Sequence, residues 1–316
     1  MSNVQIIVVG AGAFGKNHVR IFSEIGSLLG VVDQNASLLS EIADIYPGTC
    51  CWETLGDAIL DAPKAAIVIA TPAPTHFKLA KFALEQGRDV LVEKPFTMSS
   101  EEAKILIELA QKSGLVLMVG HLLLFQPFLS WFKEEFETGR LGAIKRVSTQ
   151  RTKLGTVRSS ENVWWSFAPH DVSVVLEILG RPKLSSVAAH AACVLQSEVE
   201  DDVHVELAFS NGTFAHIHCS WLWPDNVRRT TVICEHKMLI YDEIENSITI
   251  LNSKINPDLS HQLDSSPEVI RLPKVNLLEL EALHFLARIQ DRSSPIPDGD
   301  NGRMVVDILE KAQKLL

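Results

Sequence analysis

Short apolar runs alternate with amphipathic stretches over the first 120 residues or so of the chain. The runs are apolar at almost every position, which is typical of strands buried on both faces of a sheet. They are residues 4–9, 28–32, 65–70, 90–93 and 115–119. The stretches with helical spacing between them are residues 14–25, 36–45, 54–60, 75–86 and 99–112. This alternation predicts an α/β domain with a doubly wound parallel sheet.

From about Gly142 the pattern changes to longer strands separated by turns. Apolar and polar residues alternate in Thr213–Ser220, and Asn211-Gly212 before them is a strong hairpin signal. The predicted strands are residues 143–153, 183–195, 202–209, 213–221, 229–235, 237–241, 247–251 and 269–272. We therefore expect a first domain over residues 1–120, followed by an α+β domain over residues 121–316 with a large, mainly antiparallel open sheet.

Three helices are predicted among these strands. The first has Pro169 in its first turn and ends before Gly180, in keeping with the preference for proline at helix starts and glycine after helix ends. The other two, residues 277–290 and 301–316, close the chain. The polar segment Asn252–Pro267 is predicted to be a surface loop.

The composition excludes several classes of protein and partner. The chain is 46% hydrophobic and 22% charged, as in an ordinary globular protein rather than a disordered one. Its net charge of −10 would repel phosphate backbones, so we expect no nucleic-acid partner. No apolar run approaches the roughly 18 residues of a membrane span, so we expect no membrane partner. The five cysteines show no disulfide framework, and the N-terminus lacks a basic signal-peptide start, so we expect a cytoplasmic protein.

A glycine-rich turn follows the first predicted strand. Gly10, Gly12 and Gly15 have the GxGxxG spacing that lets a pyrophosphate approach the backbone at a helix N-terminus, as in Rossmann domains. Asp33 lies 21 residues after Gly12, at the end of the second strand, where its carboxylate would accept hydrogen bonds from both ribose hydroxyls. A carboxylate there would repel a 2′-phosphate, so the predicted cofactor is NAD. In this turn the expected cofactor-binding residues are Gly10, Gly12, Ala13, Phe14 and Gly15.

Two further segments leave the carboxyl ends of predicted parallel strands, where ligands bind in this architecture. Thr71-Pro72 and His76 follow the third strand, and Glu93-Lys94-Pro95 follows the fourth. Lys94 is conspicuous at the end of an apolar strand, because lysine is rarely buried without a partner or a task. We expect Thr71, Pro72, His76, Glu93 and Lys94 to bind the cofactor.

These motifs, above all Glu93-Lys94-Pro95, resemble those of the glucose–fructose oxidoreductase/inositol dehydrogenase (Gfo/Idh/MocA) family. The resemblance covers essentially the whole chain and implies an enzyme that moves a hydride between a nicotinamide and the hydroxyl-bearing carbon of a sugar or cyclitol. It further implies that Lys94 binds the reacting hydroxyl and that a histidine of the second domain acts as acid and base.

The resemblance places that histidine at His170. Many family members carry an aspartate four residues before it, but this chain has Ser166, so we expect Lys94 and His170 to be the catalytic residues. We expect His170 near a helix N-terminus, where the dipole disfavours its protonated form. Further residues are expected to bind the cofactor: His121 and Trp165. The expected substrate-binding residues are Lys94, Arg151, Asn162 and His170.

A narrower resemblance lies in Gly120–Leu123, Glu161–Asp171 and Ser220–Pro224. These segments are similar to the branch that oxidises the 3-hydroxyl of UDP-N-acetylhexosamines, UDP-N-acetylglucosamine among them, or of their uronic acids, for a partner aminotransferase. The resemblance therefore implies a nucleotide-sugar 3-dehydrogenase. Two alternatives stay open: an aldose, inositol or keto-sugar dehydrogenase or reductase of the same fold, and a non-catalytic NAD(H) sensor.

Two expectations concern the second domain. His204, His216 and His218 lie on neighbouring predicted strands, but no carboxylate or cysteine completes a set at recognisable spacing, so no metal site is predicted. A sheet of this size has a face that needs covering, so we expect a homodimer or homotetramer built through it.

Overall fold

The computed structural model describes residues 4–155, 157–159, 161–256 and 258–316. The chain forms two compact units. The first unit contains residues up to 122 together with residues 276–307, and the second contains residues 123–275 and 308–316. The sequence pattern predicts a single change of domain after residue 120. The structure instead assigns the segment 276–307 to the first unit, because that segment packs beside the parallel sheet.

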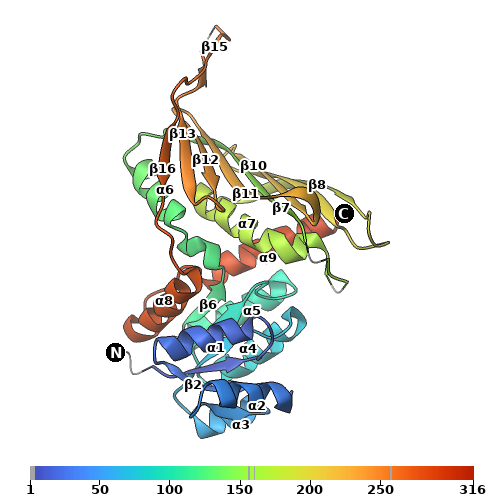
Figure 1. The fold of residues 1–316 in the computed structure, drawn as a ribbon, viewed down its shortest axis with the longest axis vertical. Coiled ribbons are helices and arrows are strands. Elements are labelled where there is room, and N and C mark those ends of the chain that lie inside the picture. Colours follow the sequence, from blue (N-terminus) through green and yellow to red (C-terminus); the bar gives the residue numbers. More distant parts are fainter. Residues whose placement is uncertain (1–3, 156, 160, 257) are drawn as a thin grey trace. The chain divides into compact units, whose positions relative to one another are not determined.

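The first unit is built on a six-stranded parallel sheet (Figure 1). Its strands are β1 Ile6–Val9, β2 Leu28–Val32, β3 Cys50–Trp52, β4 Ala66–Ile69, β5 Val90–Glu93 and β6 Leu117–Gly120. Their order is β3-β2-β1-β4-β5-β6, the doubly wound order of dinucleotide-binding domains. The predicted fold is confirmed. Strand β3 was not predicted, since it is three residues long and its sequence carries no buried run.

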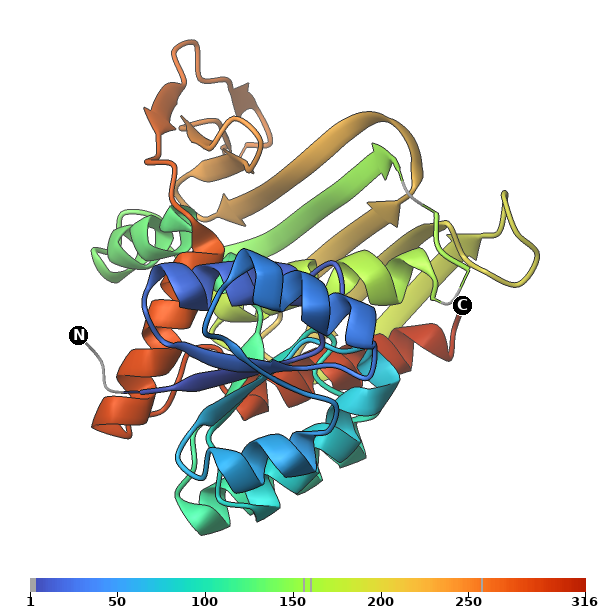
Figure 2. The same ribbon diagram turned by 60° about the horizontal axis from the view of Figure 1, so that its bottom comes forward.

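Helices cover both faces of this sheet. They are α1 Gly15–Glu24, α2 Ala36–Ile45, α3 Leu55–Asp61, α4 His76–Glu85 and α5 Ser100–Ser113, with the 3-10 helix η1 Ala73–Thr75. Figure 2 shows α1 and α2 on one face and α4 and α5 on the other. Helix α8, Leu277–Asp291, packs against α1. Helix α9, Gly299–Gln313, starts in this unit and ends in the second one.

The second unit contains an eight-stranded sheet of order β16-β13-β12-β11-β7-β10-β9-β8. Its strands are β7 Ile144–Leu154, β8 Leu184–Ala192, β9 Asp202–Phe209, β10 Phe214–Ser220, β11 Leu222–Cys234, β12 Met238–Asp242, β13 Ser247–Leu251 and β16 Glu268–Arg271. Every neighbouring pair is antiparallel except β7 and β10. The prediction of a mainly antiparallel sheet is confirmed. The predicted loop 252–267 contains a short ribbon, β14 Lys254–Ile255 and β15 His261–Gln262, that projects beyond the sheet (Figure 1).

Helix α7, Val163–Leu179, packs on β7, β9 and β10, and α6, Pro127–Glu137, packs on α7. Helix α6 was not predicted. Helix α7 starts earlier than predicted, because the side chain of Asn162 accepts a hydrogen bond from Trp165 N and caps it. Pro169 therefore lies inside the helix and not in its first turn. No helix in the described part of the chain is long and apolar enough to span a membrane.

Candidate active site

The glycine-rich turn has the close contacts that its sequence implies. Gly10 has a φ of +99°, and a Cβ there would lie 2.8 Å from Ala70 O. A Cβ on Gly15 would lie 1.9 Å from Gly10 O, so α1 can start here only with glycine. A Cβ on Gly12 would meet nothing within 4 Å. The backbone at Gly12 is therefore open to a ligand at the N-terminus of α1.

Asp33 is held at the carboxyl end of β2 by backbone donors. Its Oδ2 accepts a hydrogen bond of 2.7 Å from Ala11 N, and its Oδ1 accepts one of 2.8 Å from Asn35 N. These bonds fix the carboxylate beside the glycine-rich turn. Asn35 also caps α2 through its own side chain.

A cavity of about 650 Å³ lies at this edge of the sheet. Its lining includes Gly10, Gly12, Asp33, Thr71 and Pro72. All five are among the predicted cofactor-binding residues, and the structure brings them together within one unit. The exposed Glu53, which was not predicted, also lines the cavity, so a 2′-phosphate would meet two carboxylates there. The site fits a dinucleotide without that phosphate, as NAD is.

His76 is buried and joins two loops at this edge. Its Nε2 lies 2.8 Å from Thr71 O and its Nδ1 lies 2.9 Å from Pro95 O. Thr71 Oγ1 is also hydrogen-bonded to Thr75 Oγ1 at 2.6 Å. His76 thus holds the loop after β4 against the loop after β5. The predicted role of His76 was cofactor binding, and the structure shows that both of its ring nitrogens contact backbone carbonyl oxygens of these loops.

Lys94 directly follows β5 and is half-buried. Its backbone N–H donates to Glu93 Oε2 at 3.1 Å. Glu93 is itself 5% exposed, and its Oε1 lies 2.7 Å from His18 Nε2 on α1. The predicted cofactor residue His121 is fully buried after β6, where its Nδ1 lies 2.7 Å from Asn301 Oδ1 on α9. Neither His18 nor Asn301 was predicted to be near the site.

In the second unit, His170 lies in the middle of α7, seven residues after its first residue. The expected place near the helix N-terminus was therefore wrong, and with it the expected effect of the dipole, which falls off within the first turn. Trp165 lies in that first turn, where its Nε1 donates to Gln313 Oε1 at 3.1 Å. Asn162 was predicted to bind substrate. Its Nδ2 donates hydrogen bonds of 2.7 Å to Glu200 and Gln313, and its Oδ1 caps α7, so both polar atoms of the side chain have partners within the protein.

Arg151, also predicted to bind substrate, belongs to a buried ion cluster. Its Nε donates to Asp171 Oδ2 at 2.7 Å and its Nη2 donates to Glu243 Oε2 at 2.9 Å. Burial opposes the guanidinium charge, but Asp171 and Glu243 outweigh it and raise the pKa of Arg151. Burial likewise opposes the Glu243 carboxylate, but Arg151 and then Arg228 lower its pKa. The cluster fixes the residue that follows His170.

A second polar group lies on the sheet of this unit. Asp202 Oδ1 is 3.4 Å from His204 Nε2 and 3.3 Å from His218 Nε2. The two imidazole rings stack at 3.9 Å, and burial followed by the charge of His204 lowers the pKa of His218. No carboxylate was predicted beside these histidines, yet Asp202 supplies one, because it lies two residues before His204 on the same face of β9.

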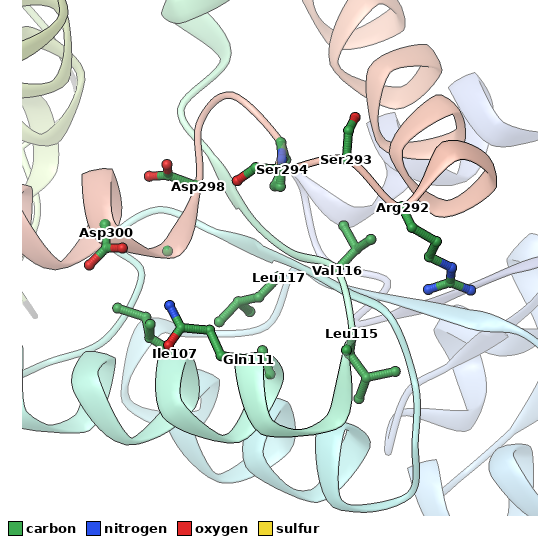
Figure 3. Close-up of a pocket in the computed structure, with 14 residues that line it drawn as sticks. Ile107, Gln111, Leu115, Val116, Leu117, Arg292, Ser293, Ser294, Asp298 and Asp300 are labelled. Atoms are coloured by element: carbon green, nitrogen blue, oxygen red, sulfur yellow. The ribbon is translucent and has the colours of Figure 1, made fainter.

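Another pocket, of about 280 Å³, lies in the first unit where α5 ends and β6 begins (Figure 3). Its labelled residues include Gln111, Val116, Arg292, Asp298 and Asp300. Because it lies at the start of β6, it is far along the strand from the carboxyl ends where the cavity beside Asp33 opens. None of the predicted site residues lines it.

Comparison with known proteins agrees with this arrangement. Residues 4–121 match the family model described as "Oxidoreductase family, NAD-binding Rossmann fold", and residues 131–240 match that of the "GFO/IDH/MocA C-terminal domain". The chain is 28% identical to UDP-N-acetylglucosamine 3-dehydrogenase of Acidithiobacillus ferrooxidans over 97% of this chain and 95% of that protein. It is 24% identical to scyllo-inositol 2-dehydrogenase (NAD(+)) of Bacillus subtilis, over 93% and 88% respectively.

A solved structure of UDP-N-acetylglucosamine 3-dehydrogenase from Acidithiobacillus ferrooxidans has a TM-score of 0.86. It is 26% identical, and the match covers 99% of this chain and 97% of that one. The predicted fold class, the enzyme class and the cofactor NAD are confirmed. With both of its halves matched by models of one family, the chain belongs to the glucose–fructose oxidoreductase/inositol dehydrogenase (Gfo/Idh/MocA) family of NAD-dependent oxidoreductases.

Proposed function

We propose that the chain is a sugar dehydrogenase that oxidises the 3-hydroxyl of a UDP-N-acetylhexosamine, or of its uronic acid, to a ketone. The observation that carries this proposal is the similarity to UDP-N-acetylglucosamine 3-dehydrogenase, which extends over 97% of the chain. The cavity beside Asp33 supports it, because it suits the cofactor of such a reaction. Lys94, placed directly after β5, supports it further.

In the proposed reaction His170 accepts the proton of the sugar hydroxyl, and Lys94 donates a hydrogen bond to the oxygen as negative charge develops on it. Bound NAD would supply the hydride acceptor. General acid–base catalysis of this kind contributes about 10²–10⁴-fold to the rate. Asp33 and the glycine-rich turn bind and orient the cofactor, which accounts for much of the remaining acceleration. We assign no metal to the reaction.

A panel of substrates tests the proposal. We expect NADH absorbance to rise with UDP-N-acetylglucosamine or its uronic acid and NAD, while free N-acetylglucosamine, glucose and inositols react at least about 10-fold more slowly. The ketone is trapped with hydroxylamine and identified by mass spectrometry. Faster turnover of an inositol or a free sugar would move the assignment to the alternative dehydrogenases. Tight NADH binding without turnover of any of these compounds would favour a sensor.

Three further proposals accompany this function. A 3-keto nucleotide sugar is a substrate for transamination, so an aminotransferase is the proposed consumer of the product. The sheet of the second unit is the proposed interface of a homodimer or homotetramer, which light scattering at micromolar concentration tests. All five cysteines are free thiols, which supports a location in the reducing cytoplasm.

A further inference from the structure

The first unit buries three titratable side chains together beneath the segment that carries Lys94. They come from distant parts of the sequence: His18 from α1, Glu93 from β5 and Glu281 from α8. Their exposures are 1%, 5% and 0%. A nitrogen of His18 and one carboxylate oxygen from each glutamate lie within 4.8 Å of one another. The proposed reaction uses none of the three.

Glu281 is the unusual member of this cluster. Neither of its carboxyl oxygens has a hydrogen-bond partner among the residues that the structure describes. A buried carboxylate without a partner is costly, and a second carboxylate close by makes it costlier. Burial, followed by the charge of Glu93, raises the pKa of Glu281 well above its ordinary value. A neutral acid is therefore the form that this position tolerates.

The distances favour a shared proton over a metal ion. His18 Nε2 and Glu93 Oε1 are 2.7 Å apart, which is the length of a charge-assisted hydrogen bond. Two ligand atoms at about 2.0–2.2 Å from a tetrahedral zinc would lie about 3.3–3.6 Å apart. Glu93 and His18 thus form a hydrogen-bonded pair, and Glu281 adds an acid that can hold a proton beside it.

Glu93 connects this cluster to the proposed catalytic lysine. Its other oxygen accepts a hydrogen bond from the backbone N–H of Lys94. If Gly120 had a Cβ, the carboxyl carbon and both carboxyl oxygens of Glu93 would each lie 3.0 Å from it. The carboxylate therefore packs against β6 at Gly120, where any larger residue would crowd it. His18 is on the helix that begins with the glycine-rich turn, so the cluster links the cofactor turn to the Lys94 segment.

We propose that Glu281 holds a proton within this cluster at neutral pH and is a positioning residue for Lys94, acting through the Glu93–His18 pair. The second half of this inference rests on the proposed role of Lys94. The titratable groups that face Glu281 are Glu93 from β5 and His18 from α1, while His284 follows one turn later on its own helix.

The protonation of Glu281 is tested without any substrate. In the infrared difference spectrum of the whole protein minus Glu281→Gln at pH 7, we expect the carbonyl stretch of a protonated carboxylic acid. Differences confined to ionised carboxylate bands would overturn the proposal. Melting temperatures give a second readout. The folded protein binds this proton more tightly than the unfolded chain, so stability falls as the pH rises above the ordinary glutamate value of about 4.3.

Glu281→Gln does not titrate, so its melting temperature should match that of the wild type near pH 4 and exceed it increasingly toward pH 7–8. The control is Glu108→Gln, at an exposed glutamate on α5, which should show no such trend. A difference that stays constant from pH 4 to pH 8 would contradict a held proton.

The positioning role is tested by kinetics with saturating NAD and the best sugar of the panel. Glu281→Gln keeps the shape and a hydrogen donor, so its kcat should stay within about 2-fold of the wild type. Glu281→Leu should lower kcat about 10-fold, measured well below its melting temperature. Equal losses in both variants would mean that the ionised form is needed, and unchanged kcat in both would leave only a packing role. Either result overturns the proposal, whereas an active Lys94→Met variant would overturn the proposed function instead.

Discussion

Each unit buries a cluster of ionisable side chains beside one of the two proposed catalytic residues, but the two clusters differ in their balance of acidic and basic groups. In the first unit Glu93 directly precedes Lys94, and its cluster contains two carboxylates and one histidine. In the second unit Asp171 directly follows His170, and its cluster contains two carboxylates bound by Arg151, with Arg228 also bonded to Glu243. One cluster lacks a permanent cation and the other is built around one.

This difference gives Glu281 and Glu243 opposite responses to pH. Asp171 of the second cluster does not follow Glu243, because burial raises its pKa in spite of the nearby Arg151. A carboxyl whose pKa rises on folding, as for Glu281, loses its stabilising effect as the pH increases. A carboxylate whose pKa falls on folding, such as Glu243, stabilises the folded protein at pH values above its ordinary pKa, and this stabilisation is lost as the pH decreases through the lowered pKa. The backbone beside each proposed catalytic residue is thus fixed differently, by the proposed held proton in the first unit and by the ion pairs of Arg151 in the second.

The largest expected effect comes from removing the cation of the second cluster. Arg151→Met leaves Asp171 and Glu243 buried without their main partner, which should lower the free energy of unfolding by about 3–5 kcal/mol. Urea denaturation measures it. The control is Arg229→Met: Arg229 is about half exposed and 3.8 Å from Asp242, so its loss should cost within about 0.5 kcal/mol.

The same variant separates the structural role of Arg151 from its predicted role in substrate binding. If Arg151 serves the ion cluster, the KM for the sugar should change little at a temperature where the variant is folded. A large rise in KM with unchanged stability would restore the substrate-binding prediction and would remove the second cluster from the comparison.

The proposed catalytic residues beside the two clusters, His170 and Lys94, should affect kcat about equally. His170→Asn and Lys94→Met should each lower kcat by about 10²-fold or more. Binding of NAD, measured by fluorescence quenching, should be nearly unchanged in His170→Asn. Lys94→Met should also raise the KM of the sugar, because it loses the hydrogen bond to the reacting hydroxyl. Full activity in both variants would favour the sensor alternative.

The pH dependence of stability can be compared between a variant of each cluster. Glu243→Gln removes a carboxylate that accepts hydrogen bonds from two arginines, so it should lower the free energy of unfolding by about 1–3 kcal/mol at pH 7. The loss should shrink as the pH falls below the ordinary glutamate pKa of about 4.3, because the unfolded wild-type chain then binds a proton that the folded carboxylate, with its lowered pKa, does not. The sign is the reverse of that expected for Glu281→Gln, and a parallel trend in both variants would show that the clusters do not differ as described.

We expect cofactor choice to depend on a third kind of carboxylate, one that accepts hydrogen bonds from two backbone amides. Asp33 accepts hydrogen bonds from Ala11 N and Asn35 N and lines an open cavity. Asp33→Ala should narrow the preference for NAD over NADP by about 10-fold, measured as the ratio of kcat/KM values. Glu53→Ala is a useful companion, since this second carboxylate lines the same cavity. Equal use of both cofactors by the unmodified protein would contradict the role of Asp33.

Much of the fold could be predicted from the sequence, because five of the six strands of the first unit are runs of apolar residues and the strands of the second unit alternate. The glycine-rich turn could be predicted too, since its chemistry is local. Helix α7 shows the limit. Pro169 suggests a helix start, yet nearly every residue around it is buried, and that packing offsets the missing backbone donor.

The supporting residues of the site could not be predicted, for a physical reason. Glutamate and asparagine are mostly exposed residue types, and only tertiary packing buries Glu281 on α8 and Asn301 on α9. They reach the ends of β5 and β6 because residues 276–307 return to the first unit. No pattern within those helices specifies which strand they meet. The place of Asp202 beside two histidines could not be predicted for another reason. Its spacing from His204 can be read from the sequence, but its contact with His218 depends on the register of β9 and β10.

The smallest expected effect is at Ser166, where many family members carry an aspartate. Ser166 is buried on α7, one turn before His170. A serine cannot accept a proton at neutral pH as a carboxylate does, so Ser166→Ala should change kcat by less than about 2-fold. Ser166→Asp is the informative partner: it would place a carboxylate one turn from His170, which should raise the pKa that governs kcat on its acidic side. A loss in Ser166→Ala as large as that in His170→Asn would mean that the serine takes part in a proton relay, and the proposed role of His170 as the sole proton acceptor would then be wrong.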